Sequence, residues 1–285
     1  MKAVYIRKIG IEGLWGAEDL EWELGPEVNI LAGSNGSGKS TVLRCLGDLF
    51  TQGAIAPNHR GRLRTLRVEF TDGTAVSSGE PFDPSVYRVS VVNTFDTVLQ
   101  ESEAVRKLSD GTVATYLDWE LYKLQNRYLT YQIEIGKRVI DALQAGRNAE
   151  EVQAFTFRKR RYFDLLDELL EATGKRVDRD SDTMQFRTRH GATIRPHQLS
   201  SGEKQILLIL TQVLVQDGQP FVMIMDEPEI SLHFDWQRRL LEDIRQLNPH
   251  LQLIVATHSP AVVMNGWTDR VTEIGDLIRP AARRD

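Results

Sequence analysis

The sequence predicts an α/β fold with an antiparallel N-terminal sheet and an inserted helical subdomain. Residues 2–8 and 20–24 alternate apolar and polar positions, which is typical of half-buried antiparallel strands. The apolar run Val28–Ala32 then enters a glycine-rich loop, and Ser40–Phe50 follows with apolar residues on one helical face. From about Val98 to Gly174 the strand signals disappear and helix formers dominate. These three observations predict strands, a strand–loop–helix unit and helices, in this order.

Composition limits what the chain can be. At 285 residues it is long enough for one large α/β domain with an insertion, or for two small domains. Apolar residues make up 41% and charged residues 26%, as in soluble globular proteins. The net charge of −5 gives no overall attraction to nucleic acid, so such binding would need a local basic patch. Cys45 is the single cysteine, which excludes an intrachain disulfide and a cysteine-ligated zinc cluster.

The sequence carries no signal for export or membrane insertion. The first residues lack the apolar core of a signal peptide, and no apolar run approaches the ~18 to 20 residues that span a bilayer. We therefore expect a cytoplasmic protein that does not contact a membrane.

Further strands are predicted on both sides of the helical region. Residues 62–76 have the pattern of a hairpin that turns at Asp72-Gly73, since this dipeptide favours the backbone of a tight turn. Val86–Val92 is another predicted strand. Later strands are expected at Thr183–Arg189, Met223–Asp226 and Leu253–Ala256, and a helix at Ile206–Val215.

Two helices are predicted in the central region. The first has apolar residues three or four apart, which places them on one face: Leu117, Leu121, Leu124, Tyr128, Tyr131, Ile135 and Val139. The second runs from Ala149 to Ala172 and contains Phe155, Tyr162, Leu165, Leu166, Leu169 and Leu170. The first stripe covers only about three heptads, so we expect a helical hairpin or small bundle rather than a long coiled-coil arm.

These patterns divide the chain into four segments. Residues 1–97 are expected to form the N-terminal half of an α/β domain, residues 98–182 a helical insertion, and residues 183–278 the C-terminal half. Residues 279–285 are expected to be a flexible tail.

Residues 33–40 satisfy the pattern G-x4-G-K-[ST] of a phosphate-binding loop. Its glycines let backbone N–H groups surround phosphate oxygens, and the N-terminus of the following helix adds positive potential. Lys39 would reach the β- and γ-phosphates of ATP, and the Ser40 hydroxyl would ligate Mg²⁺. The expected nucleotide-binding residues of the loop are Gly33, Ser34, Asn35, Gly36, Ser37, Gly38, Lys39, Ser40 and Thr41. A glycine turn before a structural helix is the alternative.

The apolar run Met223–Met225 ends in two acids, Asp226 and Glu227. Asp226, at a strand end, would hold the hydration shell of Mg²⁺, and Glu227 would polarise the attacking water. The alternative is a pair of acids that only begins a loop. The phosphate-binding loop earlier in the chain favours the catalytic interpretation.

The segment Leu199-Ser-Ser-Gly-Glu-Lys-Gln205 resembles the signature motif of ABC-type ATPases, with Ser201 where most of them have glycine. The resemblance implies that Ser200, Ser201 and Gly202 contact the γ-phosphate of ATP held by another copy of the chain. Two copies would then enclose two composite sites. The same serines also suit a helix cap, and both interpretations can hold together.

His258 follows the predicted strand Leu253–Ala256, as the switch histidine of ABC ATPases follows a strand. By resemblance it would contact the γ-phosphate and sense hydrolysis. The expected catalytic residues are therefore Glu227, His258 and Lys39. A histidine with a purely structural role at the strand end is the alternative.

Two further segments, Asp226-Glu-Pro-Glu-Ile-Ser-Leu-His233 and Ala256-Thr-His-Ser-Pro260, resemble the OLD-like branch of ABC ATPases, which is akin to RecF and SMC proteins. Transporter subunits typically carry Ser-Ala-Leu-Asp in the first segment. The resemblance covers residues 1–97 and about 183–277. It implies a P-loop fold of ABC-head type, Mg²⁺-dependent ATP hydrolysis, and a homodimer or higher even oligomer on ATP binding.

The sequence departs from this branch at two places. Phe234 stands where the branch usually has proline. No glutamine for the Q-loop directly follows the predicted strand that ends at Val92, and Asn93, Asp96 and Gln100 are the candidates. Many OLD-like proteins carry a C-terminal Toprim nuclease, whereas this chain ends too soon after its last motif. We therefore expect any nuclease to be a separate protein.

Two basic segments are candidate nucleic-acid contacts. Arg158-Lys-Arg-Arg161 lies between aromatic residues, a combination that suits phosphate contact with base stacking. A solvated helix face is the alternative for this segment. Arg60, Arg62 and Arg64 alternate along a predicted strand start and would share one face.

A tryptophan near the N-terminus and a group of three acids each allow two interpretations. Trp15 either stacks on the adenine ring or is a core tryptophan. Asp178, Asp180 and Asp182 indicate either a metal site or a polar loop before the next strand.

The expected purpose of the ATP cycle is to control a separately encoded effector, a nuclease or toxin, as in prokaryotic anti-phage systems built on OLD-like ATPases. The expected cofactors are ATP and Mg²⁺. One alternative is a DNA-repair or DNA-maintenance ATPase resembling RecF or SMC proteins, with DNA as a partner. Another is the ATP-binding subunit of a transporter, against which the Ser-Leu-His segment at residues 231–233 counts.

Overall fold

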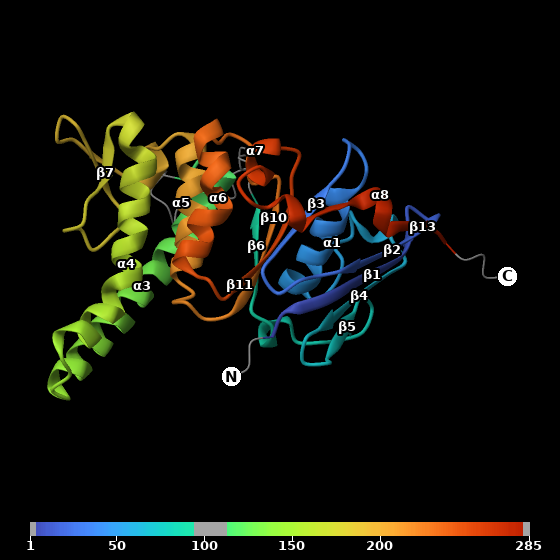
Figure 1. The fold of residues 1–285 in the computed structure, drawn as a ribbon, viewed down its shortest axis with the longest axis horizontal. Helices are drawn as coiled ribbons and strands as arrows, with labels where there is room; N and C mark the ends of the chain where they lie inside the picture. The colour runs from blue at the N-terminus through green and yellow to red at the C-terminus, as the bar shows by residue number, and fades with distance from the viewer. Residues whose placement is uncertain (1–3, 94–112, 282–285) are drawn as a thin grey trace. The chain divides into compact units, whose positions relative to one another are not determined.

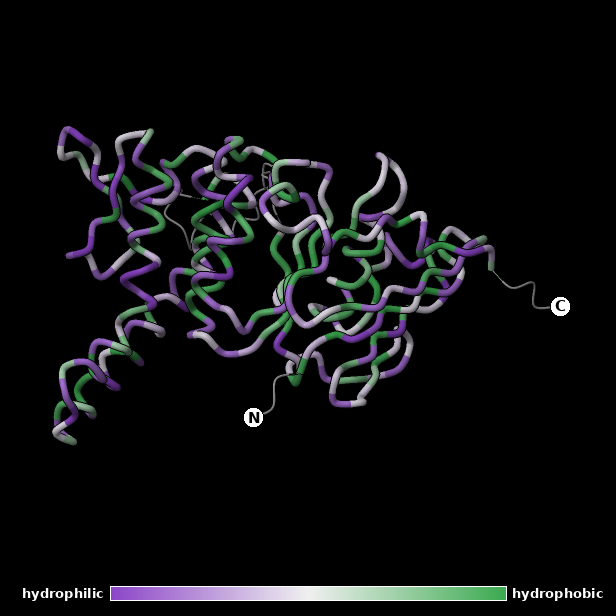
Figure 2. Tube along the Cα trace, in the orientation of Figure 1, coloured by the Kyte–Doolittle hydropathy of each residue, from purple (hydrophilic) through white to green (hydrophobic). Residues whose placement is uncertain are grey.

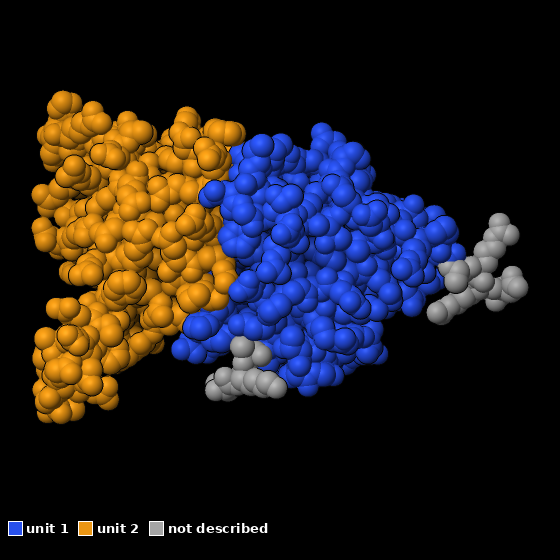
Figure 3. Space-filling view, viewed as in Figure 1, with its two compact units in different colours: residues 1–94, 219–229, 250–285 blue, residues 95–218, 230–249 orange. Residues whose placement is uncertain are grey.

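The computed structural model describes residues 4–93 and 113–281, and the chain folds into two compact units (Figure 3). The sheet unit comprises Met1–Thr94, Gln219–Glu229 and His250–Asp285. The helical unit comprises Phe95–Gly218 and Ile230–Pro249. The chain therefore leaves the sheet unit twice and returns to it twice.

The antiparallel sheet of the sheet unit has the strand order β13-β2-β1-β4-β5 (Figure 1). Its strands are β1 (Ile6–Leu14), β2 (Glu18–Glu23), β4 (Thr65–Phe70), β5 (Ala75–Ser77) and β13 (Ile278–Pro280). Buried and more exposed residues alternate along β1 and β4, because one face of the sheet packs on the core. The predicted antiparallel pair and the hairpin around Asp72-Gly73 are confirmed.

The second sheet of this unit is parallel, with the order β12-β3-β11-β10-β6. Its strands are β3 (Val28–Ala32), β6 (Val89–Asn93), β10 (Phe221–Asp226), β11 (Leu251–Ala256) and β12 (Val271–Glu273). Every residue of β10 and β11 is buried, as expected for central strands covered on both faces. The green segments of Figure 2 show these strands as continuous hydrophobic runs.

α1 (Lys39–Gln52) shares one core with both sheets. Its buried residues Val42 and Leu46 belong to the same hydrophobic cluster as Ile9 of β1 and Ile224 of β10. Two short helices, α7 (Pro260–Val263) and α8 (Ile274–Leu277), follow β11 and β12. The described 3-10 turns are Arg60–Arg62, Pro84–Val86, Glu171–Thr173, Pro196–Gln198 and Thr268–Arg270.

Two predictions for the sheet unit are wrong. Arg60–Arg62 forms a 3-10 turn and the strand begins only at Thr65, so the three arginines do not alternate along one strand face. Arg279 and Pro280 belong to β13 instead of a flexible tail, because their backbone is in register with β2. Such pairing uses main-chain groups and leaves little mark in the side-chain pattern. Residues 282–285 of the predicted tail lie outside the described residues.

The helical unit contains the predicted pair of helices, α3 (Tyr116–Gln144) and α4 (Ala149–Leu170). Thr115 and Asp118 form a capping box at the start of α3, and Asn148 caps α4. All residues of the predicted stripe on α3 are buried except Val139. The unit is completed by a small antiparallel sheet and two further helices: β7 (Lys175–Val177), β8 (Phe186–Thr188), β9 (Thr193–Ile194), α5 (Ser201–Leu214) and α6 (Phe234–Leu247).

Among the described residues, none of the helices combines the length and apolarity that crossing a bilayer requires.

Two ion pairs hold the first turn of α5 within the helical unit. Lys204 Nζ lies 2.8 Å from Asp118 Oδ1, with both side chains at least nine-tenths buried. Lys175 Nζ lies 2.7 Å from Glu203 Oε1. Burial by itself would raise the pKa of Glu203, but the hydrogen bonds from Lys175 and from backbone N–H of Ser200 hold that pKa below its usual value. The two pairs fix α5 against the start of α3 and against β7.

Lys204→Met should destabilise the protein by about 3–5 kcal/mol, because Asp118 would remain buried without its cation. Adding Asp118→Asn should restore much of the lost stability, since the side-chain oxygen of asparagine can still accept the capping hydrogen bonds of α3 but carries no charge. Urea unfolding followed by circular dichroism measures both effects. Lys123→Met is the matched control, because Lys123 forms an exposed pair with Glu120 and should cost less than about 1 kcal/mol. Equal losses for the two lysines would contradict this account.

Candidate functional site

Parallel strand pairing brings three loops to one edge of the sheet. Asp226 at the end of β10 pairs with Ala256 at the end of β11, and Ala256 pairs with Leu31 of β3. The carboxyl ends of these strands are therefore neighbours, and each loop that follows them starts at the same edge. The three predicted motifs of the sheet unit, which are far apart in sequence, begin at these positions.

The loop at residues 33–38 has the backbone of a phosphate cradle. Gly33, Gly36 and Gly38 have φ of 149°, 78° and 100°, a region that side-chain-bearing residues rarely adopt. Lys39 Nζ donates hydrogen bonds to Gly33 O at 2.8 Å and Ser34 O at 3.1 Å, so the lysine folds back over the loop. Burial lowers the pKa of Lys39, and the nearby Glu227 and Asp226 carboxylates oppose that shift.

The loop residues fit the phosphates of a nucleotide. The Ser37 hydroxyl is buried without a hydrogen-bond partner in the described structure, as a donor reserved for a ligand would be. A Cβ on Gly36 would meet no atom within 4 Å, which leaves room above the loop. A cavity of about 510 Å³ opens there, lined by Trp15, Asn35, Gly36, Gly38, Lys39, Ser40, Thr41, Glu227 and His258.

The residues predicted to hold magnesium lie together. Ser40 Oγ donates a hydrogen bond to Asp226 Oδ1 at 2.9 Å, and Arg44 Nε lies 3.3 Å from Asp226 Oδ2. A hydroxyl and a carboxylate oxygen are ligands that Mg²⁺ prefers. The donor set therefore fits Mg²⁺ beside the phosphate cradle.

Glu227, His258 and Lys39 form one polar chain. His258 Nε2 lies 3.2 Å from Glu227 Oε1, and His258 Nδ1 lies 3.5 Å from Lys39 Nζ. Glu227 has φ 48°, a left-handed backbone that is strained for glutamate, and its N–H donates to Ala256 O at 2.8 Å. The three residues predicted to be catalytic are thus brought together by β10, β11 and α1.

Glu229 is a residue of this site that the sequence analysis missed. Its Oε1 accepts hydrogen bonds from Thr257 Oγ1 at 2.5 Å, His258 N at 2.9 Å and Ser259 N at 3.1 Å. The side chain is buried, with 8% exposure. One carboxylate oxygen therefore fixes the backbone that carries His258. The third acid in Asp226-Glu-Pro-Glu was the sequence signal, but an acid after proline also suits a solvated loop.

The signature-like residues belong to the helical unit. Ser200 caps α5 and forms a capping box with Glu203, so the predicted cap is present. Ser201 is exposed at the first turn, whereas Gly202 is buried. A Cβ on Gly202 would lie 2.3 Å from Ser231 O, so the glycine is required by packing within the unit. A role of Ser200, Ser201 and Gly202 toward nucleotide remains a prediction.

Trp15 is not a core tryptophan. Its side chain is 44% exposed, and its ring lies so close to Gly38 that a Cβ there would approach ring carbons at 2.2 Å. The ring therefore forms a wall of the cavity beside the phosphate cradle. The prediction of a core position is wrong because Trp15 has φ 52° in the turn between β1 and β2 and points away from the core.

The candidate Q-loop positions are only partly described. Asn93 ends β6, and the register of the sheet places it next to Asp226. Asp96 and Gln100 lie outside the described residues.

The basic segment of α4 is engaged within the helical unit. Arg158 contacts Asp217, with 3.5 Å between its Nη1 and Oδ1, and Arg161 bonds to Gln246 and Glu168. These contacts within the unit count against nucleic-acid contact, and they also show that Arg158 and Arg161 are not part of a freely solvated helix face, the alternative interpretation. At the turn after β7, Asp178 forms an ion pair with Arg187 at 2.9 Å, which is the behaviour of a polar loop.

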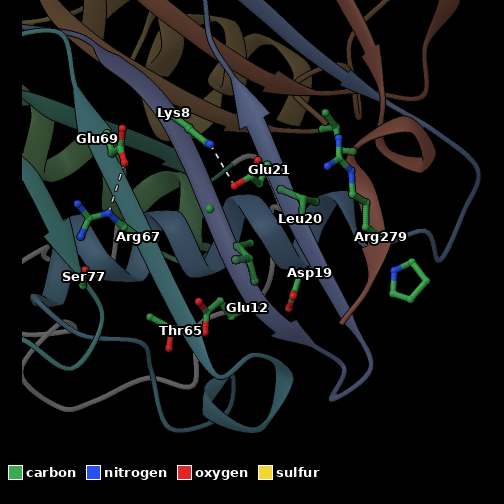
Figure 4. Close-up of a pocket in the computed structure, with 14 residues that line it drawn as sticks. Lys8, Glu12, Asp19, Leu20, Glu21, Thr65, Arg67, Glu69, Ser77 and Arg279 are labelled. Carbon is green, nitrogen blue, oxygen red and sulfur yellow. Dashed lines mark hydrogen bonds and ion pairs between the residues drawn. The ribbon is translucent and has the colours of Figure 1, made fainter. Parts of the chain in front are cut away.

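A second hollow, of about 550 Å³, lies on the outer face of the antiparallel sheet (Figure 4). Lys8 pairs with Glu21 at 3.0 Å and Arg67 pairs with Glu69 at 3.4 Å across this face. The two cations are neutralised by neighbouring acids, so the surface lacks the donor-rich character of the phosphate cradle.

Comparison with known proteins agrees with this geometry. Residues 28–265 match the family described as "AAA domain, putative AbiEii toxin, Type IV TA system". The chain is similar to the Septu protein PtuA of Bacillus thuringiensis, with 23% identity over 319 residues, 95% of this chain and 76% of PtuA. A shorter match, 26% identical, links 31% of this chain with 20% of the "Retron Vc95 probable ATPase" of Vibrio cholerae serotype O1 biovar El Tor.

Among solved structures, the chain is similar to the Smc head domain of Pyrococcus furiosus, in a complex with the C-terminal domain of ScpA. The TM-score is 0.54 at 14% identity, over 92% of each chain. This similarity confirms the predicted P-loop fold of ABC-head type with a helical insertion.

Glu229→Ala should lower the free energy of unfolding by roughly 1–3 kcal/mol, because three donors around His258 would lose their acceptor. Glu229→Gln should cost less, since its amide oxygen still accepts hydrogen bonds. Chemical denaturation without nucleotide tests this. Glu227→Gln, in the same loop, is the control and should change stability little. A wild-type unfolding midpoint for Glu229→Ala would show that these contacts contribute nothing.

Proposed function

Because the chain belongs to the AAA_21 family of AAA-domain ATPases, we propose that it is a Mg²⁺-dependent ATP hydrolase that pairs around ATP and controls a separately encoded effector. The observation that carries the hydrolase proposal is the polar chain Lys39–His258–Glu227 beside the Ser40–Asp226 pair. Lys39, His258, Glu227 and Ser40 line one cavity, and Asp226 is hydrogen-bonded to Ser40, so the groups that phosphoryl transfer requires lie together.

Each residue then has a distinct role. Lys39 and the N–H groups of the glycine loop bind the phosphates, and Ser40 and Asp226 hold Mg²⁺. The Glu227 carboxylate orients and polarises a water. His258 Nε2, 3.2 Å from Glu227 Oε1, holds this carboxylate in position. When bound, ATP–Mg²⁺ supplies the γ-phosphoryl group and the metal charge that offsets negative charge on the phosphates.

A second copy completes the proposed site. The N-terminus of α5 presents the exposed Ser201 and the cap residue Ser200, and a helix N-terminus favours an anion. We infer that Ser200, Ser201 and Gly202 of one copy bind the γ-phosphate held by the other. ATP would then join two copies, and hydrolysis would release them.

The effector proposal rests on the relatives. The similarity to the Septu protein and to a retron ATPase supports a role in anti-phage defence, in the cytoplasm, with a nuclease or toxin as the controlled partner. The internal contacts of Arg158 and Arg161 reduce support for the alternative of a DNA-binding repair ATPase.

Glu227→Gln should lower kcat for ATP hydrolysis by about 10²–10⁴ while ATP binding persists, because general-base catalysis is lost without loss of the phosphate cradle. Lys39→Ala should lose ATP binding. Hydrolysis assays and native mass spectrometry with ATP–Mg²⁺ measure both. The Glu227→Gln protein, isolated from its host, should carry ATP in a dimer or larger even assembly together with a second protein. A monomer without nucleotide would refute the ATP clamp, and a nucleotide-bound dimer without another protein would refute effector control.

Trp15→Ala should weaken ATP binding by about five- to a hundredfold, because stacking of a base on an aromatic ring contributes about 1–3 kcal/mol. Binding of inorganic tripolyphosphate should stay unchanged, since the ring does not bind phosphate. Calorimetric titration of both ligands on the wild-type and variant chains separates the two contributions. Equal weakening for both ligands would show that Trp15 only supports the loop at Gly38.

A further inference from the structure

Trp15 has a backbone conformation that its surroundings must hold in place. Its φ of 52° lies in the left-handed region, which is unfavourable for a bulky side chain and persists only where other contacts enforce it. The Trp15 N–H donates a hydrogen bond of 2.7 Å to the main-chain oxygen of Arg62. The position of the ring beside Gly38 therefore depends on a residue outside the turn between β1 and β2.

Arg62 belongs to a turn, residues 57–62, that lies between α1 and β4. Its flanks are anchored, since Ile55 and Leu63 are buried in the core of the sheet unit. Between these anchors, every residue from 57 to 62 is exposed except His59. The Arg62 N–H donates to His59 O at 2.9 Å. His59 is therefore the residue through which the middle of the turn can be held.

His59 is held by Asp48 of α1. Its Nδ1 lies 2.7 Å from Asp48 Oδ2, and the two side chains are 12% and 15% exposed. Since an ionised carboxylate only accepts hydrogen bonds, Nδ1 is the donor. The same Asp48 oxygen accepts a hydrogen bond of 3.1 Å from the N–H of Ala56, immediately before the turn. One carboxylate oxygen thus ties this segment to α1 at two points.

α1 connects these contacts to the phosphate cradle (Figure 1). The helix starts directly after Gly38, and Asp48 lies in its C-terminal half. The contacts described above then lead from the Asp48 carboxylate to Trp15, whose ring lies against Gly38. The helix therefore carries the end of the cradle and also determines where the ring stands beside it.

We propose that Asp48 and His59 are positioning residues for the nucleotide base, which hold Trp15 where its ring stacks on the base of ATP. The proposal rests on the stacking role that we propose for Trp15. Both residues lie outside the set that lines the cavity, and they act through the main chain of Arg62. Their effect is therefore confined to ligands that carry a base, since a bare polyphosphate has no ring to stack.

Asp48→Ala should raise the dissociation constant of ATP at least about twofold, and by no more than Trp15→Ala does, because the ring loses its fixed position. Binding of inorganic tripolyphosphate should stay unchanged, which also shows that the variant is folded. Asp48→Asn should behave as wild type, since its side-chain oxygen still accepts hydrogen bonds from His59 and Ala56. Thr51→Ala is the control, because it loses a hydrogen bond within α1 only. Calorimetric titration of both ligands measures these effects.

A double substitution separates positioning from general support of the fold. In the Trp15→Ala background, Asp48→Ala should cause no further loss of ATP affinity, because the group that it positions is gone. His59→Ala should behave as Asp48→Ala does in both backgrounds. Additive losses of ATP affinity, or equal weakening of ATP and tripolyphosphate by Asp48→Ala, would overturn the proposal.

Hydrogen exchange measures the hold on Trp15 without nucleotide. Its amide should exchange at least about fivefold faster in His59→Ala than in the wild type, as expected for the loss of one hydrogen bond of ordinary strength. An unchanged exchange rate would overturn the proposal, whatever the ATP affinities. Faster exchange together with unaltered ATP affinity of Trp15→Ala would support the hold on Trp15 and refute its stacking on the base.

Discussion

The parallel pairing of β3, β11 and β10 is the constraint on which the candidate site depends. Strand pairing sets Asp226 beside Ala256 and Ala256 beside Leu31, so the loops after the three strands begin at one edge. A shift of the register by one residue would turn every side chain of a strand to the opposite face and would displace the start of the loop that follows it. The pairing of these apolar strands thus places Lys39, His258 and Glu227 together.

Features set by local sequence could be predicted, whereas features set by tertiary pairing could not. The strand Val28–Ala32, the glycine loop and the two central helices follow from periodicity and caps, and the resemblance to ABC-head ATPases is confirmed. β13 and the 3-10 turn at Arg60–Arg62 depend on main-chain bonding, which leaves little mark in the side-chain pattern. Glu229 was missed because its hydrogen bonds join loops of two different strands.

The signature-like segment combines two kinds of residue. Glu203 and Lys204 point inward to Lys175 and Asp118, whereas Ser200 and Ser201 remain exposed. The charged half of the motif is thus explained by ion pairs within the helical unit, whereas Ser200 caps α5 and Ser201 lies at its exposed first turn. Predicting the inward half needed the positions of α3 and β7, which lie outside the motif in sequence.

The close approach of Gly202 to Ser231 affects how substitutions at Gly202 should be interpreted. Ser231 presents a main-chain oxygen, which cannot rotate aside as a side chain would, and a Cβ on residue 202 would lie 2.3 Å from it. Any substitution at Gly202 would therefore distort the junction between α5 and the segment before α6. Loss of activity in such a variant would follow from this distortion, even if the residue never touched a nucleotide. Substitutions at the exposed Ser201 can therefore test whether the segment binds nucleotide, whereas substitutions at Gly202 cannot, because they also disturb packing.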